Sequence, residues 1–589
     1  MRGETRRYQR NGTLGFWQPQ APASSALASG DALERHLLAS LEQCRDLSSS
    51  SDELRQYIVD WPTEYHLSPA RHNLLRPLRI GGEHRVLEFD CGCGALTRYL
   101  GETCKEVVAV ESSVTRAAIA AERCRDLPNV RIYGDTLMDF ASAERFDFVC
   151  LIGVLEHAPV SIPGADPVGE CLRIARHFLA PHGQLILAIE NQIGLKYFNG
   201  CREDHLGERY FGLHDLYREH QPITFGRREL AGRLAAAGFE QQRFYYPFPD
   251  YKLPTLIMSD QAMLDPELRP ADMLCRTSSR DRVGQTRCNF SENLAWQALA
   301  RNGLMADLAN SFLVLAAPGV PVESAPPSER WLASSYTHQR QARYAIETLF
   351  VRSDEGLTVS KRRLMPPSIT ACADSFVMHR PSEAARYVQG RLYLCELQRL
   401  LASDGTLASV ADWARPWLDA LQAQSNAVRA GELLPNDWLD AIPANFVRKD
   451  DGTLQVIDTE WFAVEPVPIS WVVVRGLINS FTACPVPPAL AKMSFRELID
   501  GSLHLLSHPP LGKSAYQRAA ELEDELALLV YGPVRGVPHL TELLERPLFS
   551  FCAPPSMEDE VATMLASRSW RLTAPLRIAN AWFTKLTGG

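Results

Sequence analysis

The chain has 589 residues, a length that exceeds one hydrophobic core, so we expect roughly two to four domains. Its formal net charge of -9 argues against nucleic acid as a main partner, because phosphate binding requires clustered lysine and arginine. No apolar run reaches membrane-spanning length and no signal-peptide pattern follows Met1, which predicts a cytoplasmic protein. The 14 cysteines lack the paired spacing of zinc ligands.

The first fifty residues predict little regular structure. Residues 1–30 mix Arg, Gln, Gly, Ser and Ala without a sustained apolar period, which is typical of a loose tail. Two helices are expected to follow, over residues 32–47 and 52–60. We therefore assign residues 1–50 to a flexible or helical N-terminal segment.

A buried strand and a glycine turn come next, in the sequence RVLEFDCGCGALTRYL. The strand covers residues 86–89, Gly92 and Gly94 make the turn, and a helix opens after them. Because glycine has no Cβ, the backbone N–H groups of such a turn can approach an adenine-nucleotide-type ligand closely. The motif alone is also compatible with a glycine turn in some other doubly wound fold.

Further short strands follow at suitable distances. The strand over residues 106–110 ends on Glu111, whose carboxylate is placed to accept hydrogen bonds from both ribose hydroxyls of an adenosine. A third strand leads to Asp135. A fourth, over residues 146–153, leads to His157.

This order of elements resembles the class I S-adenosylmethionine (SAM)-dependent methyltransferases. The resemblance implies that Glu88, Gly92 and Gly94 hold the methionine part of SAM, that Glu111 holds the ribose, and that Asp135 lies by the adenine amine. Asp90 departs from the pattern, because that family usually has glycine there. A carboxylate at this position would repel the methionine carboxylate, which leaves reduced SAM affinity or loss of activity open.

The ends of the later strands are expected to rim the acceptor site, because ligands lie beyond the carboxyl ends of parallel strands. His157 is the leading candidate for a general base, since the ordinary pKa of histidine lies near neutrality. The charged and aromatic loop over residues 194–217 suits a lid over a polar acceptor or a plain surface insertion. The expected rim residues are Glu156, His157, Glu190 and Asn191, and the loop adds Lys196, Glu203, Asp204 and His205.

Two strands, over residues 239–247 and 310–316, are interpreted as the antiparallel pair that ends a methyltransferase sheet, with a polar insertion between them that runs to about Ser291. The methyltransferase domain is therefore assigned to residues 51–318. The strings YHLSPARHNLLRPL, GCGALTRYLGE, ENQIGLKYFNGCREDH and YYPFPDYKLP resemble a bacterial methyltransferase group encoded with surface-polysaccharide enzymes.

A linker rich in Pro, Ser and Ala, residues 319–330, precedes a second domain over residues 331–565. The second domain opens with a β-hairpin that carries Lys361 on its second strand. Far downstream come three polar residues, Asp440, Asn445 and Asp458, the last at the end of a strand. A lysine on a hairpin, Asp with Asn five residues on, and a strand ending in Asp form the minimal set of a kinase.

The second domain resembles the kinase-like fold of choline and aminoglycoside kinases. The resemblance implies ATP and Mg²⁺, with Lys361 on the nucleotide phosphates, Asp440 as the catalytic residue, and Asn445 and Asp458 as metal ligands. The pattern has gaps: no glycine-rich loop precedes the lysine, and Glu383 is its best candidate partner. The alternative is a helical partner domain in which Asp440 and Asn445 are turn and cap residues.

The C-terminus is expected to be helical, and residues 566–589 mix tryptophans with basic residues. That mixture suits an interfacial membrane helix, a docking segment, or packing on the kinase-like lobe. The predicted fold class is therefore α/β, with a Rossmann-like methyltransferase sheet followed by an α+β kinase-like domain and a helical C-terminus.

The combination of domains resembles the bifunctional methyltransferase-kinases that terminate O-antigen chains. The resemblance implies a glycan or lipid-linked saccharide acceptor, modified at its sugar terminus by phosphorylation, O-methylation or both. It also implies glycosyltransferase partners and contact with the inner membrane surface. Two alternatives stay open: a catalytically weakened scaffold that docks glycosyltransferases, and a methyltransferase for a small metabolite.

Overall fold

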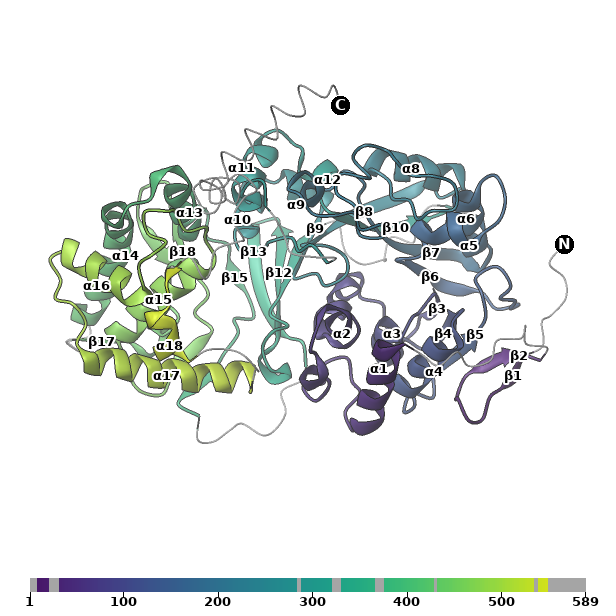
Figure 1. Cartoon of the computed structure of the whole chain (residues 1–589), viewed down its shortest axis with the longest axis horizontal. Helices are drawn as coiled ribbons and strands as arrows, with labels where there is room; N and C mark the ends of the chain where they lie inside the picture. Colours follow the sequence, from purple (N-terminus) through teal and green to yellow (C-terminus); the bar gives the residue numbers. More distant parts are fainter. Residues whose placement is uncertain are drawn as a thin grey trace, which may run out of the picture.

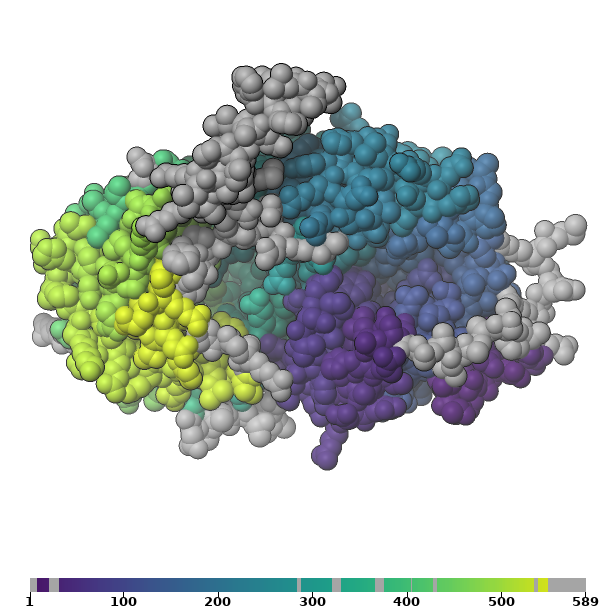
Figure 2. Space-filling view, viewed as in Figure 1, coloured from purple at the N-terminus to yellow at the C-terminus, as the bar shows by residue number. Residues whose placement is uncertain are grey.

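A computed structural model describes residues 8–20, 31–282, 288–319, 330–365, 375–427, 432–533 and 539–548. In these residues one mixed sheet of 14 strands runs from the N-terminal segment into the second half, in the order β1-β2-β5-β4-β3-β6-β7-β10-β8-β9-β11-β12-β13-β15. The helical C-terminal part lies at the other end of the elongated molecule (Figures 1 and 2). No helix in the described ranges is long and apolar enough to span a membrane.

The centre of the sheet has five parallel strands followed by an antiparallel pair. These strands are apolar on both sides because helices cover both faces. The predicted Rossmann-like sheet and its closing antiparallel pair are confirmed. The strands are β3 (Arg85–Phe89), β4 (Glu106–Glu111), β5 (Val130–Gly134), β6 (Phe146–Ile152), β7 (Leu179–Glu190), β8 (Gln241–Phe248) and β10 (Ser311–Ala317).

The helices of this half begin at identifiable caps. Asp31 caps α1 with a capping box, Ser113 accepts a hydrogen bond at the start of α4, and Asp166 does the same for α6. The α-helices are α1 (Ala32–Gln43), α2 (Trp61–Leu67), α3 (Ala95–Thr103), α4 (Val114–Arg123), α5 (Ala158–Ser161), α6 (Pro167–His177), α7 (Leu195–Phe198), α8 (Arg227–Ala236), α9 (Asp260–Leu264), α10 (Pro270–Met273), α11 (Glu292–Arg301) and α12 (Met305–Leu308).

The N-terminal segment corrects the prediction of a loose tail. A hairpin of β1 (Tyr8–Arg10) and β2 (Trp17–Pro19) extends the sheet, with Trp17 paired to Tyr133 of β5. Phe16 is fully buried beside Gly134, where a Cβ would lie 2.6 Å from its ring. Burial of this aromatic residue holds the hairpin against the sheet. The sequence did not indicate this, because no other apolar residue recurs with a regular period around Phe16. The helix expected over residues 52–60 is only a short 3₁₀ turn, Leu54–Tyr57.

The expected polar insertion after β8 contains a strand that the sequence did not indicate. This strand, β9 (Leu256–Ser259), is buried throughout and pairs with β8 on one side and with β11 (Trp331–Tyr336) on the other. The sheet therefore continues into the second half through β11, β12 (Ile346–Ser353), β13 (Gly356–Arg363) and β15 (Ala385–Arg386). The predicted linker, apart from Gly319 and Arg330 at its two ends, lies outside the described residues.

The second half has its own core, built around Trp417 and Trp471, which are both fully buried. It consists of short antiparallel pairs and of helices, and the predicted tail over residues 566–589 lies outside the described residues. The elements are β14 (Val377–His379), β16 (Arg391–Leu392), β17 (Leu433–Leu434), β18 (Phe446–Arg448), β19 (Leu454–Val456), β20 (Trp461–Ala463), β21 (Val467–Pro468), α13 (Tyr393–Asp404), α14 (Leu407–Ala427), α15 (Ile469–Thr482), α16 (Phe495–Leu505), α17 (Lys513–Tyr531) and α18 (Leu540–Glu545).

Candidate functional site

The turn between β3 and α3 has the geometry that its glycines predict. Asp90, Gly92 and Gly94 all have positive φ angles, of 49°, 56° and 75°. A Cβ at Gly94 would lie 2.9 Å from the Cα of Ala120, so the helix can pack there only with glycine. A Cβ at Gly92 would meet nothing within 4 Å, so this part of the turn faces open space.

Glu111 links the ends of the first two strands. One oxygen, Oε2, accepts a hydrogen bond of 2.8 Å from the backbone N–H of Gly92. The other, Oε1, accepts from the N–H of Ser113 at 2.9 Å and pairs with Arg116 at 3.1 Å. Since a carboxylate offers about four acceptor positions, Oε2 keeps a lone pair for a further donor such as a ribose hydroxyl.

Of the two acids at the end of the first strand, Glu88 is buried and Asp90 is exposed. Burial raises the pKa of Glu88 to about 7, although a hydrogen bond of 2.6 Å from the Thr97 hydroxyl opposes the shift. Although Asp90 is exposed, the protein around it displaces part of its water, and this loss together with the nearby charge of Glu111 raises its pKa to about 6. Both carboxyl groups therefore change protonation close to neutral pH.

Asp135 lies at the end of β5, under the N-terminal hairpin. Its Oδ2 accepts a hydrogen bond of 2.7 Å from the Tyr8 hydroxyl, and its Oδ1 accepts from the N–H of Thr136 at 2.9 Å. The hairpin thus covers this carboxylate. The structure brings Glu88, Asp90, Gly92, Gly94, Glu111 and Asp135 to the carboxyl ends of β3, β4 and β5, as parallel strands require.

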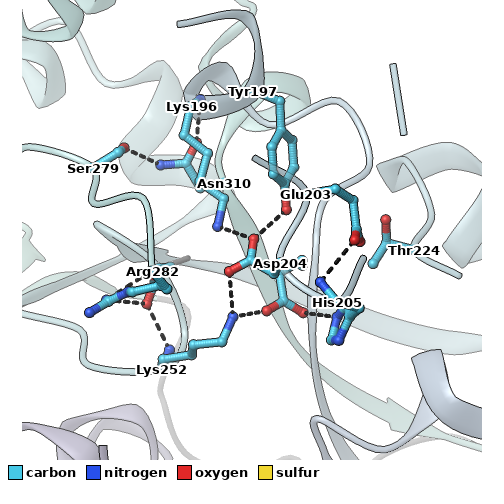
Figure 3. A network of polar contacts seen from close by, with 12 residues as sticks. Lys196, Tyr197, Glu203, Asp204, His205, Thr224, Lys252, Ser279, Arg282 and Asn310 are labelled. Carbon is cyan, nitrogen blue, oxygen red and sulfur yellow. Dashed lines mark hydrogen bonds and ion pairs between the residues drawn. The ribbon is translucent and has the colours of Figure 1, made fainter. Parts of the chain in front are cut away.

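A buried network of ion pairs lies beyond the ends of β6 and β7 (Figure 3). Asp204 is at its centre: its Oδ2 accepts from Lys196 and from the Tyr197 hydroxyl, each at 2.6 Å, and its Oδ1 pairs with Lys252 at 2.9 Å. Lys252 also contacts Oε1 of Glu190. Three charged side chains of the loop after β7, those of Lys196, Glu203 and Asp204, are buried, so this part of the loop is not a plain surface insertion.

The sequence reasoning missed three residues of this network. The first is Lys252, which follows β8. The other two, Asp250 and Arg282, form a buried ion pair of 3.1 Å. The Arg282 guanidinium also stacks 3.6 Å from the centre of the Trp61 ring. The string YYPFPDYKLP contains the first two of them and lies directly after a strand. That position at a strand end was the available signal.

Glu156, Glu190 and His205 face one another beside the network. The His205 Nε2 atom lies 3.4 Å from Oε2 of Glu190 and 4.0 Å from Oε1 of Glu156. The ring of His157 meets the ring of His205 edge-on, with centroids 5.0 Å apart. Loss of solvent, followed by the charge of His205, lowers the pKa of His157 to about 4, so its imidazole is neutral at neutral pH.

Asn191, also fully buried, donates to the backbone carbonyls of residues 307 and 309.

A second group of charged residues lies in the second half. Lys361 contacts Asp458 and pairs with Glu460 at 2.8 Å. The prediction that Glu383 is the partner of Lys361 is wrong, because Glu383 is exposed. The pairing of β14 with β20 brings residues near 460 to the hairpin instead. Burial raises the pKa of Asp458 to about 6, and Arg340, 2.5 Å from Glu460, helps hold the pKa of that glutamate well below its ordinary range.

Asp440 and Asn445 lie across from this group. The Asn445 amide donates to Oδ2 of Asp440 at 3.0 Å, and Arg475 pairs with Oδ1 at 2.9 Å. A cavity of about 230 Å³ separates these residues from Asp458. Three of the residues proposed from sequence for this half, Asp440, Asn445 and Asp458, therefore line one cavity, and the fourth, Lys361, contacts Asp458.

A Rossmann-like sheet, with a glycine turn after its first strand and a buried acid after its second, defines the fold of class I methyltransferases. Residues 62–242 match the family described as "Methyltransferase domain". The ubiquinone biosynthesis O-methyltransferase of Methylococcus capsulatus (strain Bath) is 24% identical over 188 residues, which are 30% of this chain and 74% of that protein. The chain therefore contains a SAM-dependent methyltransferase domain, which includes these matched residues.

Two solved structures are similar over this half. The N-methyltransferase NodS from Bradyrhizobium japonicum WM9 has a TM-score of 0.24 and 14% identity, covering 42% of this chain and 94% of that chain. A SAM-dependent methyltransferase from Thermotoga maritima, described as a possible histamine N-methyltransferase, has a TM-score of 0.25 and 15% identity, covering 42% of this chain and 89% of that chain.

Proposed function

We propose that the protein modifies the sugar terminus of a bacterial surface polysaccharide, by O-methylation in its first half and by phosphoryl transfer in its second. The observation that carries the proposal is that Asp440, Asn445 and Asp458 line one cavity, while Lys361, 97 residues before Asp458, contacts Asp458. Lysine, catalytic aspartate and two metal-binding side chains are what a phosphotransferase needs. The acceptor is a glycan or lipid-linked saccharide, handed on by glycosyltransferases at the inner membrane surface.

In the first half, the residues at the glycine turn fit SAM. Gly92 faces open space with no Cβ to fill it, and Oε2 of Glu111 keeps acceptor capacity for a ribose hydroxyl. Glu88 and Asp135 lie on either side, at the same edge of the sheet. When bound there, SAM supplies an electrophilic methyl group. The protein contributes alignment of the acceptor oxygen, which is the main source of rate in methyl transfer.

In the second half, the side chains fit ATP and Mg²⁺. Asn445 and Asp458 supply the amide and carboxylate oxygens that Mg²⁺ prefers, and Lys361 lies within reach of the phosphates they would hold. Asp440, oriented by Arg475 and by the Asn445 amide, would accept the proton of the sugar hydroxyl.

The two reactions are proposed to occur in sequence. A phosphate monoester is already ionised at neutral pH, so its oxygen needs no general base for methylation. A free sugar hydroxyl does need one, and His157 would then take the proton as the oxygen bonds to the methyl carbon. The relative from Methylococcus capsulatus is named as an O-methyltransferase, which supports oxygen as the acceptor atom.

The test uses the full chain, SAM, Mg-ATP and an oligosaccharide that matches the polysaccharide terminus. Asp458→Asn should abolish phosphorylation and, with it, methylation, whereas His157→Ala should leave methylation of a pre-phosphorylated acceptor nearly intact. Asp451→Asn, on the exposed turn before β19, is the matched control and should change neither reaction. Methylation by the wild type without ATP would contradict the sequence of steps.

The second candidate function is methylation of a small metabolite, with the second half only structural. The similarity to the ubiquinone biosynthesis O-methyltransferase favours it. Under this alternative, Asp458→Asn has no effect on methyl transfer, and a small phenolic acceptor is methylated without Mg-ATP.

A further inference from the structure

Three side chains from separate elements converge beyond the ends of β6 and β7. Glu156 follows β6, Glu190 ends β7, and His205 comes from the loop after α7. One ligand atom from each lies within 4.8 Å of the other two. Both glutamates are fully buried, and the histidine is only slightly exposed.

Two other buried acids nearby, Asp204 and Asp250, have cationic partners. Asp204 pairs with Lys196 and Lys252, and Asp250 pairs with Arg282. Each of these carboxylates is thereby compensated for its loss of water.

Glu156 differs from them. Its Oε1 has the Tyr251 hydroxyl at 3.4 Å and His205 at 4.0 Å. Its Oε2 is buried and, among the described residues, has no hydrogen-bond partner. A buried carboxylate oxygen without a hydrogen-bond partner lowers the free energy of unfolding. A bound ligand or ion can remove this cost by interacting with the oxygen.

We propose that Glu156, Glu190 and His205 bind a divalent metal cation. An ion at roughly 2.0–2.3 Å from each ligand places pairs of ligand atoms up to about 4.5 Å apart. The His205 Nε2 atom lies 3.4 Å from Oε2 of Glu190 and 4.0 Å from Oε1 of Glu156, and both distances lie inside that limit. The unpartnered Oε2 is the second oxygen of the same Glu156 carboxylate. Lys252 contacts the other oxygen of Glu190, Oε1, and so leaves Oε2 for the metal.

The ligand types select the ion. Two carboxylates favour Mn²⁺ or Mg²⁺, and one imidazole shifts the preference towards Mn²⁺, Fe²⁺ or Zn²⁺. Three protein ligands leave coordination positions open, as in catalytic metal sites. An oxygen-rich acceptor, such as a sugar hydroxyl or a phosphate, would fill them. This role in acceptor binding rests on the proposed function, whereas metal binding itself does not.

The experiment is a Mn²⁺ titration of the full chain after treatment with EDTA, with binding followed by the EPR signal of free Mn²⁺. All proteins compared in the titration also carry Asp458→Asn, which removes an ion ligand proposed for the second half. We expect one equivalent bound by the wild type, and an affinity at least about tenfold lower in Glu156→Gln and His205→Ala, because each removes a ligand. Glu208→Gln removes an exposed acid of the same loop and should bind as the wild type does. Absence of binding by the wild type, or equal binding by all four proteins, would overturn the proposal.

A second measurement does not depend on how the variants fold. Electron spin echo modulation of the Mn²⁺-loaded wild type should show coupling to an imidazole nitrogen, and its absence would also overturn the proposal. Failure of the proposed function is distinguishable: Mn²⁺ bound with nitrogen coupling but no transfer to any saccharide keeps the metal site and removes the saccharide. Transfer to a saccharide by the metal-free enzyme, together with no Mn²⁺ bound by the wild type, would keep the proposed function and overturn the metal site.

Discussion

The backbone N–H of Gly92 donates a hydrogen bond of 2.8 Å to Oε2 of Glu111, although the two residues are 19 positions apart. The bond ties the open side of the glycine turn to the end of the second strand. The group that holds the turn in place is therefore the same one that is proposed to hold the ribose.

Replacement of Glu111 should affect both roles. In Glu111→Ala the turn loses an acceptor and the ribose loses its partner, so SAM affinity should fall by about 2 kcal/mol, the scale of a charge-assisted hydrogen bond left unmade. Isothermal titration calorimetry measures this directly. Glu122→Gln, on the neighbouring helix α4, is the control and should bind SAM as the wild type does. Unchanged affinity in Glu111→Ala would contradict the assignment.

Glu88 should make stability depend on pH. Its pKa of about 7 lies above the ordinary value of 4.5, so the folded state holds the proton more tightly than the unfolded state. The free energy of unfolding should therefore fall as pH rises from about 4.5 through 7, by about 3 kcal/mol in total, and then level off. Urea unfolding at a series of pH values should show a fall that is smaller by this amount in Glu88→Gln than in the wild type. In Glu83→Gln, an exposed control, the profile should match the wild type.

Tyr8 should anchor the N-terminal hairpin. Tyr8→Phe removes the hydrogen bond of 2.7 Å to Asp135 and leaves a largely buried carboxylate oxygen with one donor fewer, at a cost of about 1 kcal/mol in unfolding free energy. Chemical denaturation measures the difference. Gln9→Ala changes the exposed neighbour on the same strand and should cost nothing measurable. Equal losses in the two variants would show that the tyrosine hydroxyl is not the anchor.

The shared sheet should make the two halves unfold together. Ile257 is fully buried in β9, between Pro247 of β8 and Ser334 of β11. Ile257→Ala should cost about 2–5 kcal/mol, the range for a buried aliphatic side chain cut to alanine, and should lower one calorimetric transition that includes both halves. Leu264→Ala, at a leucine that is 69% exposed, is the control. Two transitions, of which only one shifts, would show that the halves unfold independently.

The sequence by itself determined the central sheet and the residues at its edge. Apolar strands followed by glycine or by an acid are local patterns, and parallel strands must bring their carboxyl ends to one edge. Glu111, Gly92 and Asp135 could therefore be assigned to one site without the structure. In the second half, the spacing of Asp440 and Asn445 and the hairpin that carries Lys361 were equally local.

Only the tertiary structure decided which charges meet. The partner of Lys361 is Glu460 and not Glu383, and Lys252 joins Glu190 across 62 residues, because ion pairing depends on distances between segments that no sequence period encodes. The same reason applies to β9 and to the N-terminal hairpin. β1, β2 and β9 have only three or four residues each, and their register comes from the neighbouring strands, so their own residues carry too little pattern to predict them.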